Sequence, residues 1–246
     1  MKITVITLFP AMVTPFFTES ILKRASAKNL VDIQVVNLRE FAQDKYGTVD
    51  ESPYGGGAGM VLKADVIGRA LDSVGRGHIV LTSAKGKPYV QSKAQEFSKL
   101  DHLVIIAGHY EGVDERIMDH VDEEISLGDF VMTGGEMAAA AIVDSVVRLI
   151  PGVLKKEEAT VIESFFKTPL NELIKVVGEH ETLVALRDRG VTEVQLLEYP
   201  QYTRPEEFDG KRVPDILLSG DHKKIHEWRL KKAFEETLTK RPDLLK

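Results

Sequence analysis

Short apolar runs alternate with helix-like segments along the first half of the chain, and this alternation limits the possible folds more than any other feature. Residues 2–9 and 31–38 read as strands. Thr14 followed by Pro15 predicts the start of a helix between them, as N-cap and first helical position. Apolar side chains then recur at the spacing of one helix face, at Val13, Phe16, Phe17, Ile21 and Ala25. Such a strand, helix, strand order is typical of a parallel sheet with helices on its faces.

Two further buried-type strands continue the alternation. They are residues 78–83 (HIVLTS) and 103–107 (LVIIA), and helices are predicted at 64–74 and 90–100. The sequence therefore predicts an α/β fold built on a parallel sheet.

A short, mostly apolar run at residues 125–132, interrupted at Gly128-Asp129, contains a fifth strand, and three of the five strands end in loops that contain glycine. These loops are SAKG at 83–86, AGHYEGVDER at 107–116 and SLGDF at 126–130. Ligands of open α/β sheets bind at the carboxyl ends of the strands, so the three loops together predict a binding site. A fourth glycine loop, SPYGGGAGM at 52–60, matches neither a P-loop nor a dinucleotide fingerprint, and both a ligand role and a tight turn remain open for it.

The second loop carries several polar side chains whose roles the sequence leaves open. His109 and Tyr110 fit either ligand contact or ordinary loop packing. For Glu111, Asp114, Glu115 and Arg116 the alternative to a site is a solvated cluster that caps a helix.

A long alanine-rich helix is predicted directly after the third loop. Gly134 and Gly135 allow a sharp turn, residues 136–150 favour a helix, and Pro151-Gly152 ends it. Asp144 and Arg148 are four residues apart and share a helix face, where a surface ion pair is the simplest interpretation.

Composition excludes several classes of protein. The chain has no cysteine, so it has no disulfide, thiolate nucleophile or zinc-thiolate site. No apolar run approaches a membrane span and no signal-peptide pattern is present, which predicts a cytoplasmic protein without a membrane partner. The net charge of −6 argues against a generally basic surface, although residues 219–246 hold 8 Lys and Arg against 5 Asp and Glu, a weak indication of contact with phosphates.

Six ordered motifs resemble the bacterial tRNA (guanine-N1)-methyltransferases, the TrmD family of the SPOUT superfamily. The motifs are PYGGGAGM (53–60), GHYEGVDER (108–116), EISLGDFVMTGGE (124–136), VVRLIPGVL (146–154), YPQYTRP (199–205) and VPDILLSGDHKKIHEWR (213–229). The resemblance implies a SPOUT domain with a deep trefoil knot at 1–160, a linker with a helical insert at 161–198, and a small helical tRNA-binding domain at 199–246. It also implies a homodimer with each active site at the subunit interface, and tRNA as the partner.

The resemblance further implies which residues form the site. S-adenosylmethionine, the methyl donor, would be held largely by backbone groups of Leu81, Gly86, Gly108, Tyr110, Glu111, Gly112, Leu127, Gly128, Asp129, Phe130, Val131, Met132, Gly134 and Gly135. The reaction in the family is helped by Mg²⁺, but no compact ligand cluster in this sequence identifies a metal site.

Two side chains are implied as catalytic, Arg148 and Glu163. Guanine N1 must lose its proton before it attacks the sulfonium methyl, and negative charge then builds on O6, so the reaction needs a base and a cation. Arg148 matches the family's arginine. The family's base is the aspartate of an Asp-Ser-Phe triplet, which here is Glu163-Ser164-Phe165, and Glu198 is the alternative base.

This chain departs from the family in carrying extra residues at about 167–195, which read as helices at 170–177 and 179–189. The motifs predict methylation of N1 of the guanosine 3′ of the tRNA anticodon. The alternatives are a noncatalytic RNA- or nucleoside-binding SPOUT protein and a SPOUT methyltransferase for another RNA nucleotide.

Overall fold

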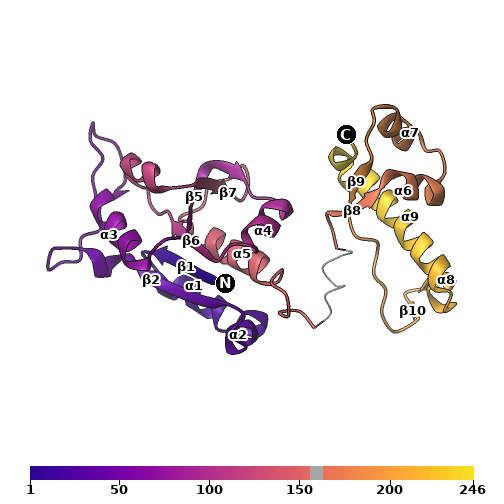
Figure 1. Cartoon of the computed structure of the whole chain (residues 1–246), viewed down its shortest axis with the longest axis horizontal. Helices are drawn as coiled ribbons and strands as arrows, with labels where there is room; N and C mark the ends of the chain where they lie inside the picture. Colours follow the sequence, from indigo (N-terminus) through magenta and orange to yellow (C-terminus); the bar gives the residue numbers. More distant parts are fainter. Residues whose placement is uncertain (156–162) are drawn as a thin grey trace. The chain divides into compact units, whose positions relative to one another are not determined.

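The computed structural model describes residues 1–155 and 163–246, which form two compact units (Figure 1). The first unit is Met1–Lys155 and the second is Lys156–Lys246. The domain boundary predicted between residues 160 and 161 lies outside the described residues. The described part of the predicted linker, 163–198, belongs to the second unit.

A parallel sheet organises the first unit, in the order β2-β1-β6-β5-β7. Each adjacent pair of these strands is parallel, which confirms the predicted α/β fold built on a parallel sheet. The strands are β1 (Lys2–Thr7), β2 (Asp32–Asn37), β5 (His78–Pro88), β6 (His102–Ala107) and β7 (Glu123–Ser126).

Helices cover both faces of this sheet because its inner strands are apolar on both faces. Leu103 and Ile105 of β6 pack into one core with α1 (Pro10–Phe17), α2 (Ser20–Ala27), α4 (Gln91–Phe97) and α5 (Glu136–Val147). Val104 and Ile106 point the other way, into a core with α3 (Ala64–Val74) and the 3₁₀ segments η1 (Leu38–Phe41) and η2 (Glu115–His120). The alternation along β6 therefore places the sheet between two helical layers.

The predicted start of the first helix at Thr14 is wrong. The helix α1 begins at Pro10, which takes the first helical position, and Pro15 lies inside it. The Thr14 hydroxyl donates back to the carbonyl oxygen of Pro10 instead of capping. Ser20, the first residue of α2, has a φ of 51°, and the chain turns there into a separate helix. Pro10 and Pro15 both fit the first helical position, and the helix begins at Pro10.

A small hairpin carries the fourth glycine loop. Its antiparallel strands are β3 (Asp50–Glu51) and β4 (Val61–Leu62), and residues 52–60 connect them. Leu62 N donates to Gly112 O over 3.0 Å, which fixes this hairpin against the loop after β6.

The second unit has a core of its own. The elements of this unit are β8 (Phe166–Pro169), α6 (Leu170–Val177), α7 (Glu181–Asp188), β9 (Glu193–Leu196), the pair β10 (Glu207–Phe208) and β11 (Lys211–Arg212), α8 (Asp215–Leu218), α9 (His222–Lys240) and η4 (Pro242–Leu245). Leu173 and Leu183 pack there with Leu230 and Phe234 of α9. The two helices predicted in the insert are therefore present, and the antiparallel strands β8 and β9 around them were not predicted.

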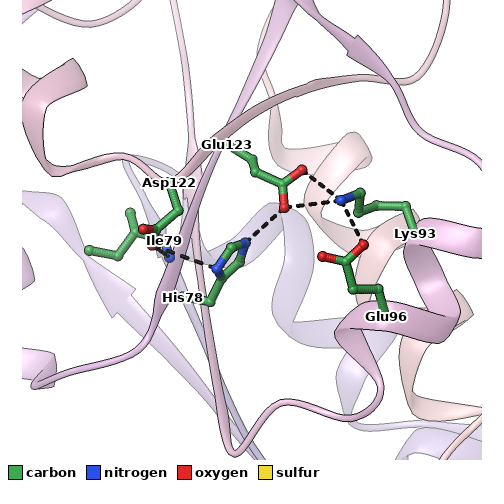
Figure 2. A network of polar contacts seen from close by, with 6 residues as sticks. All are labelled: His78, Ile79, Lys93, Glu96, Asp122 and Glu123. Atoms are coloured by element: carbon green, nitrogen blue, oxygen red, sulfur yellow. Dashed lines mark hydrogen bonds and ion pairs between the residues drawn. The ribbon is translucent and has the colours of Figure 1, made fainter.

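A chain of charged side chains joins β5, β7 and α4 at the edge of the sheet where β5 and β7 begin (Figure 2). Glu123 lies between His78, whose Nε2 is 3.0 Å from its Oε1, and Lys93, whose Nζ is 2.9 Å from its Oε2. Lys93 also bonds Glu96 over 2.8 Å. Burial alone would raise the pKa of Glu123, but the hydrogen bonds from Lys93 and His78 outweigh it and hold that pKa below its ordinary value of 4.5.

We expect this lowered pKa to make Glu123 a pH-dependent source of stability. A carboxyl group with a depressed folded-state pKa stabilises the fold above its unfolded value, and the contribution is lost as the pH falls below 4.5 through the folded-state value. Glu123→Gln should therefore lower the free energy of unfolding by roughly 1 kcal/mol at neutral pH. Urea denaturation of both proteins should give matching midpoints once the pH is below the folded-state pKa. An equal difference at neutral and strongly acid pH would contradict this origin.

Candidate functional site

A cavity of about 320 Å³ opens at the carboxyl ends of β5, β6 and β7. The loops after these three strands line it, as expected for a ligand site in a parallel α/β sheet. The cavity lies at the opposite end of β5 from the His78 network, because His78 begins the strand and Leu81 to Lys85 contribute to the lining.

Most residues predicted to hold a cofactor meet at this cavity. From the predicted set, the lining includes Leu81, Gly108, Tyr110, Glu111, Gly112, Leu127, Gly128, Phe130, Val131, Met132, Gly134 and Gly135. Gly86 and Asp129 are not among the lining residues. The lining also contains residues that the prediction omitted, among them Thr82, Ser83, Lys85, His109, Glu115 and Glu124. The sequence had left a site role open for His109 and Glu115. The others lie in or close to the same three loops, and this position was the signal that could have found them.

Gly86 is a close-packing position. The pairing of β5 with β7 shifts register between Thr82 and Lys87, and Gly86 lies in this irregular part. A Cβ built on Gly86 would lie 2.4 Å from the backbone nitrogen of Ile125 and 2.6 Å from the carbonyl carbon of Glu124. Only a residue without a side chain allows β5 to approach β7 this closely.

We expect Gly86→Ala to destabilise the first unit by roughly 1–3 kcal/mol, because the added methyl group must push β5 away from β7. Gly68→Ala is the matched control. Gly68 lies in α3 and a Cβ built there meets nothing within 4 Å, so alanine should stabilise the helix by roughly 0.5–1 kcal/mol. Far-UV circular dichroism in urea would measure both. Fluorescence of Trp228, the single tryptophan, reports the second unit separately. Equal stability of the two variants would contradict the packing role.

Backbone hydrogen bonds tie the second and third loops together. Gly135 N donates to Gly108 O over 2.6 Å, and His109 and Gly134 form an isolated antiparallel bridge. Thr82 Oγ1 donates to Ile106 O over 3.2 Å and accepts from Gly108 N over 3.2 Å. A Cβ on Gly135 would collide with Thr82 Oγ1 at 1.9 Å. The turn that begins α5 thus passes directly against the end of β6.

The polar residues of the second loop divide into two groups. Asp114 accepts from Arg116 N over 3.0 Å at the start of η2, and its carboxylate pairs with the Arg116 guanidinium over 2.6 Å. This pairing lowers the pKa of Asp114 to about 2. The capping alternative therefore holds for Asp114, whereas Glu111 and Glu115 line the cavity.

The two predicted catalytic residues lie in different units. Arg148 is the C-cap residue of α5 in the first unit, half-buried, and its backbone nitrogen donates to Asp144 O over 3.3 Å. Glu163 belongs to the second unit and lies three residues before the start of β8, and Glu163 O accepts from Phe166 N over 2.9 Å.

The segments that carry Glu163 and Glu198 are hydrogen-bonded to each other. Phe165 N donates to Leu196 O over 2.7 Å, and Glu198 N donates to Ser164 Oγ over 3.2 Å. Residues 166–196 therefore begin and end next to each other, and the paired strands β8 and β9 form the base of this segment. The predicted insert lies within this segment, whose two ends are hydrogen-bonded to each other. Glu163 and Glu198, the two candidate bases, therefore lie on neighbouring segments.

Within residues 1–155 and 163–246, no group of three or more His, Asp or Glu side chains is arranged to hold a metal ion. In the same ranges no helix combines the length and apolar character needed to cross a membrane.

Comparisons with known proteins agree on one family. A family model described as tRNA (Guanine-1)-methyltransferase TrmD matches residues 1–176 and 175–246. The two matched segments meet inside the predicted insert. A tRNA (guanine-N(1)-)-methyltransferase of Anoxybacillus flavithermus is 48% identical over 251 residues, which cover 100% of this chain and 91% of that protein. Proteins of the same name from Geobacillus kaustophilus and Geobacter sp. strain M21 are each 48% identical over 250 residues and cover 100% of this chain. These alignments cover 91% and 90% of the respective relatives.

Proposed function

The chain belongs to the tRNA (Guanine-1)-methyltransferase TrmD family, and from this we propose that it transfers a methyl group from S-adenosylmethionine to N1 of a guanosine in tRNA. The observation that carries the proposal is the cavity at the carboxyl ends of β5, β6 and β7, since the family's donor-binding motifs supply its lining.

The cavity has the size and chemistry that such a donor needs. Its volume of about 320 Å³ falls within the roughly 300–1,000 Å³ of ligand pockets. Backbone groups of the three loops offer hydrogen bonds, and Phe130, Val131 and Met132 offer apolar surface. Glu111 and Glu115 place negative charge beside the cavity, which suits a sulfonium cation.

Two side chains of this chain would perform the chemistry. The bound donor would supply an electrophilic methyl group, and its sulfur would keep the electron pair of the broken S–CH3 bond as a neutral thioether. The Glu163 carboxylate would remove the proton from guanine N1, so that the N1 lone pair can attack. The Arg148 guanidinium would stabilise the negative charge that builds on O6. After transfer, N1 carries the methyl group and Glu163 carries the proton.

Several finer properties are part of the proposal. The target is the guanosine 3′ of the anticodon, drawn out of its stack into the site. The first unit is a SPOUT domain with a trefoil knot, and the protein works in the cytoplasm as a homodimer with the active site at the subunit interface. Exposed apolar side chains on the neighbouring helices α1 and α5, Met12, Phe16 and Met137, support such an interface. Mg²⁺ would assist the reaction as in the family, although the described residues offer no site for it.

A methyl-transfer assay tests the proposal. The substrate is a tRNA transcript with guanosine at the last anticodon position and at the next one, and mass spectrometry identifies the product nucleoside. We expect 1-methylguanosine. Binding of S-adenosylmethionine without any product from that transcript or from bulk tRNA would favour the noncatalytic alternative. A different methylated nucleoside would favour a SPOUT methyltransferase for another position.

A further inference from the structure

Glu136 is a fully buried acidic residue that the proposed chemistry does not use. Its relative exposure is 0%, and it occupies the first turn of α5. A buried carboxyl group is costly unless hydrogen bonds satisfy it. Thr7, at the end of β1, donates its hydroxyl to Glu136 Oε1 over 2.9 Å. The same Thr7 oxygen accepts a hydrogen bond from Phe9 N over 2.9 Å. The hydroxyl group is therefore held in place by Phe9 while it donates its proton to Glu136.

His109 satisfies the other oxygen of Glu136. Its Nδ1 lies 3.3 Å from Glu136 Oε2, and its side chain is 13% exposed. The ring packs between Phe9 and Tyr110, with centroids 4.6 Å from each. When the carboxylate accepts at Oε2, the imidazole carries a proton on Nδ1. Glu136 therefore joins the end of β1 to the second cavity loop through a single buried carboxyl group.

The second loop contains a strained residue beside this contact. Tyr110 has a φ of 56°, a conformation that side-chain-bearing residues rarely adopt. Such strain persists only where neighbouring contacts hold it. The backbone of His109 contributes through its carbonyl oxygen, which accepts from Gly112 N over 3.0 Å. On the far side, Glu111 N donates to Met60 O over 3.0 Å. The His109 ring is the link between this turn and the buried carboxyl group.

We propose that Glu136 is a positioning residue for donor binding: it holds His109 with the proton on Nδ1 and thereby keeps residues 108–112 in the conformation that lines the cavity. This proposal rests on the proposed function for the identity of the ligand. It assigns no contact between Glu136 and the ligand. It predicts that loss of Glu136 weakens donor binding more than it lowers the rate of methyl transfer once the donor is bound.

The first test uses variants of the full chain and the product-like ligand S-adenosylhomocysteine. Glu136→Ala removes both hydrogen bonds. We expect the Kd to rise by about 10-fold or more, which corresponds to about 1.4 kcal/mol, the order of one lost buried hydrogen bond. The KM for the donor should rise in parallel, and kcat should fall by less than about 3-fold. Glu123→Gln is the matched control, because it removes a hydrogen-bonded carboxylate that does not line the cavity, and its Kd should equal the parent's. An unchanged Kd for Glu136→Ala, or a fall in kcat alone, would overturn the proposal.

A double-variant cycle shows whether Glu136 acts through His109. We expect the Kd of the Glu136→Ala, His109→Ala pair to be close to that of the weaker-binding single variant, because the second change removes a contact already lost. Fully multiplicative effects would mean that the two residues act separately and would overturn the positioning role.

Two measurements do not depend on the ligand and also serve if Glu136→Ala folds poorly. In the parent, ¹⁵N chemical shifts should identify His109 as protonated on Nδ1, with the signal assigned by its loss in His109→Gln. Glu136→Gln, which keeps the shape of the side chain, should shift this proton to Nε2 because the amide then donates to Nδ1. Hydrogen exchange at the Gly112 amide should be faster in Glu136→Gln than in Glu123→Gln. If Glu136→Gln changes neither the His109 tautomer nor the exchange at Gly112, the proposal is refuted, even if the parent binds no donor. Failure of the parent to bind the donor would count only against the proposed function.

Discussion

Arg148→Ala is expected to lower the single-turnover rate of methyl transfer by on the order of 10² or more. The reason is that removal of one preorganised donor to a developing oxyanion typically costs this much. The side chain is well placed for a fixed role, because Arg148 follows α5, whose buried residues Val146 and Val147 anchor the end of the helix in the core. Binding of the donor should change little, since Arg148 is not among the lining residues of the cavity.

The matched control for this experiment is Arg24→Ala. Arg24 is an exposed arginine in the last turn of α2, so its removal deletes the same charge from the same unit without touching α5. Its rate should equal the parent's. Near-normal single-turnover methylation by Arg148→Ala would remove Arg148 from the mechanism, and an equal loss in both variants would point to net charge and tRNA affinity instead.

The sequence predicts the sheet well because its strands carry a strong local signal. The run at 103–107 is apolar on both faces, which only a strand between two layers requires, and β6 occupies that place. Helix α3 matches its prediction at both ends. Short pairings have no such signal. The pairing of Phe166 with Leu196 in β8 and β9 joins residues thirty apart, and two helices intervene, so no local pattern indicates it.

The site divides in the same way. Loops that follow predicted strands reach the cavity because chain direction places them there. The sequence could not reveal that Gly86 packs against the backbone of β7, since that contact depends on a register shift. It also could not reveal the bond between His109 and Glu136, whose partners are far apart in the chain and meet only when α5 begins against the end of β6.

The general base presents the sharpest remaining choice, because Glu163 and Glu198 lie on hydrogen-bonded segments of the same unit. The closed insert is compatible with the role proposed for the triplet. The bonds Phe165 N to Leu196 O and Gln195 Nε2 to Phe165 O, 2.7 and 2.8 Å long, return the chain to the triplet after the excursion. The extra residues therefore need not displace Glu163.

We therefore expect Glu163→Gln to reduce the single-turnover rate by on the order of 10² or more, the usual contribution of a general base, and Glu198→Gln to retain most of the rate. Glutamine keeps the size of the side chain and removes only its basicity, so each variant is the other's control. The pH dependence separates a base from a structural residue. At high pH guanine N1 loses its proton to solvent, so the rate of Glu163→Gln should rise toward the parent's, whereas a misfolded linker would gain nothing. If Glu198→Gln instead shows the loss and the recovery at high pH, the base is Glu198. The triplet would then serve to anchor the stem of the insert through Ser164 and Phe165.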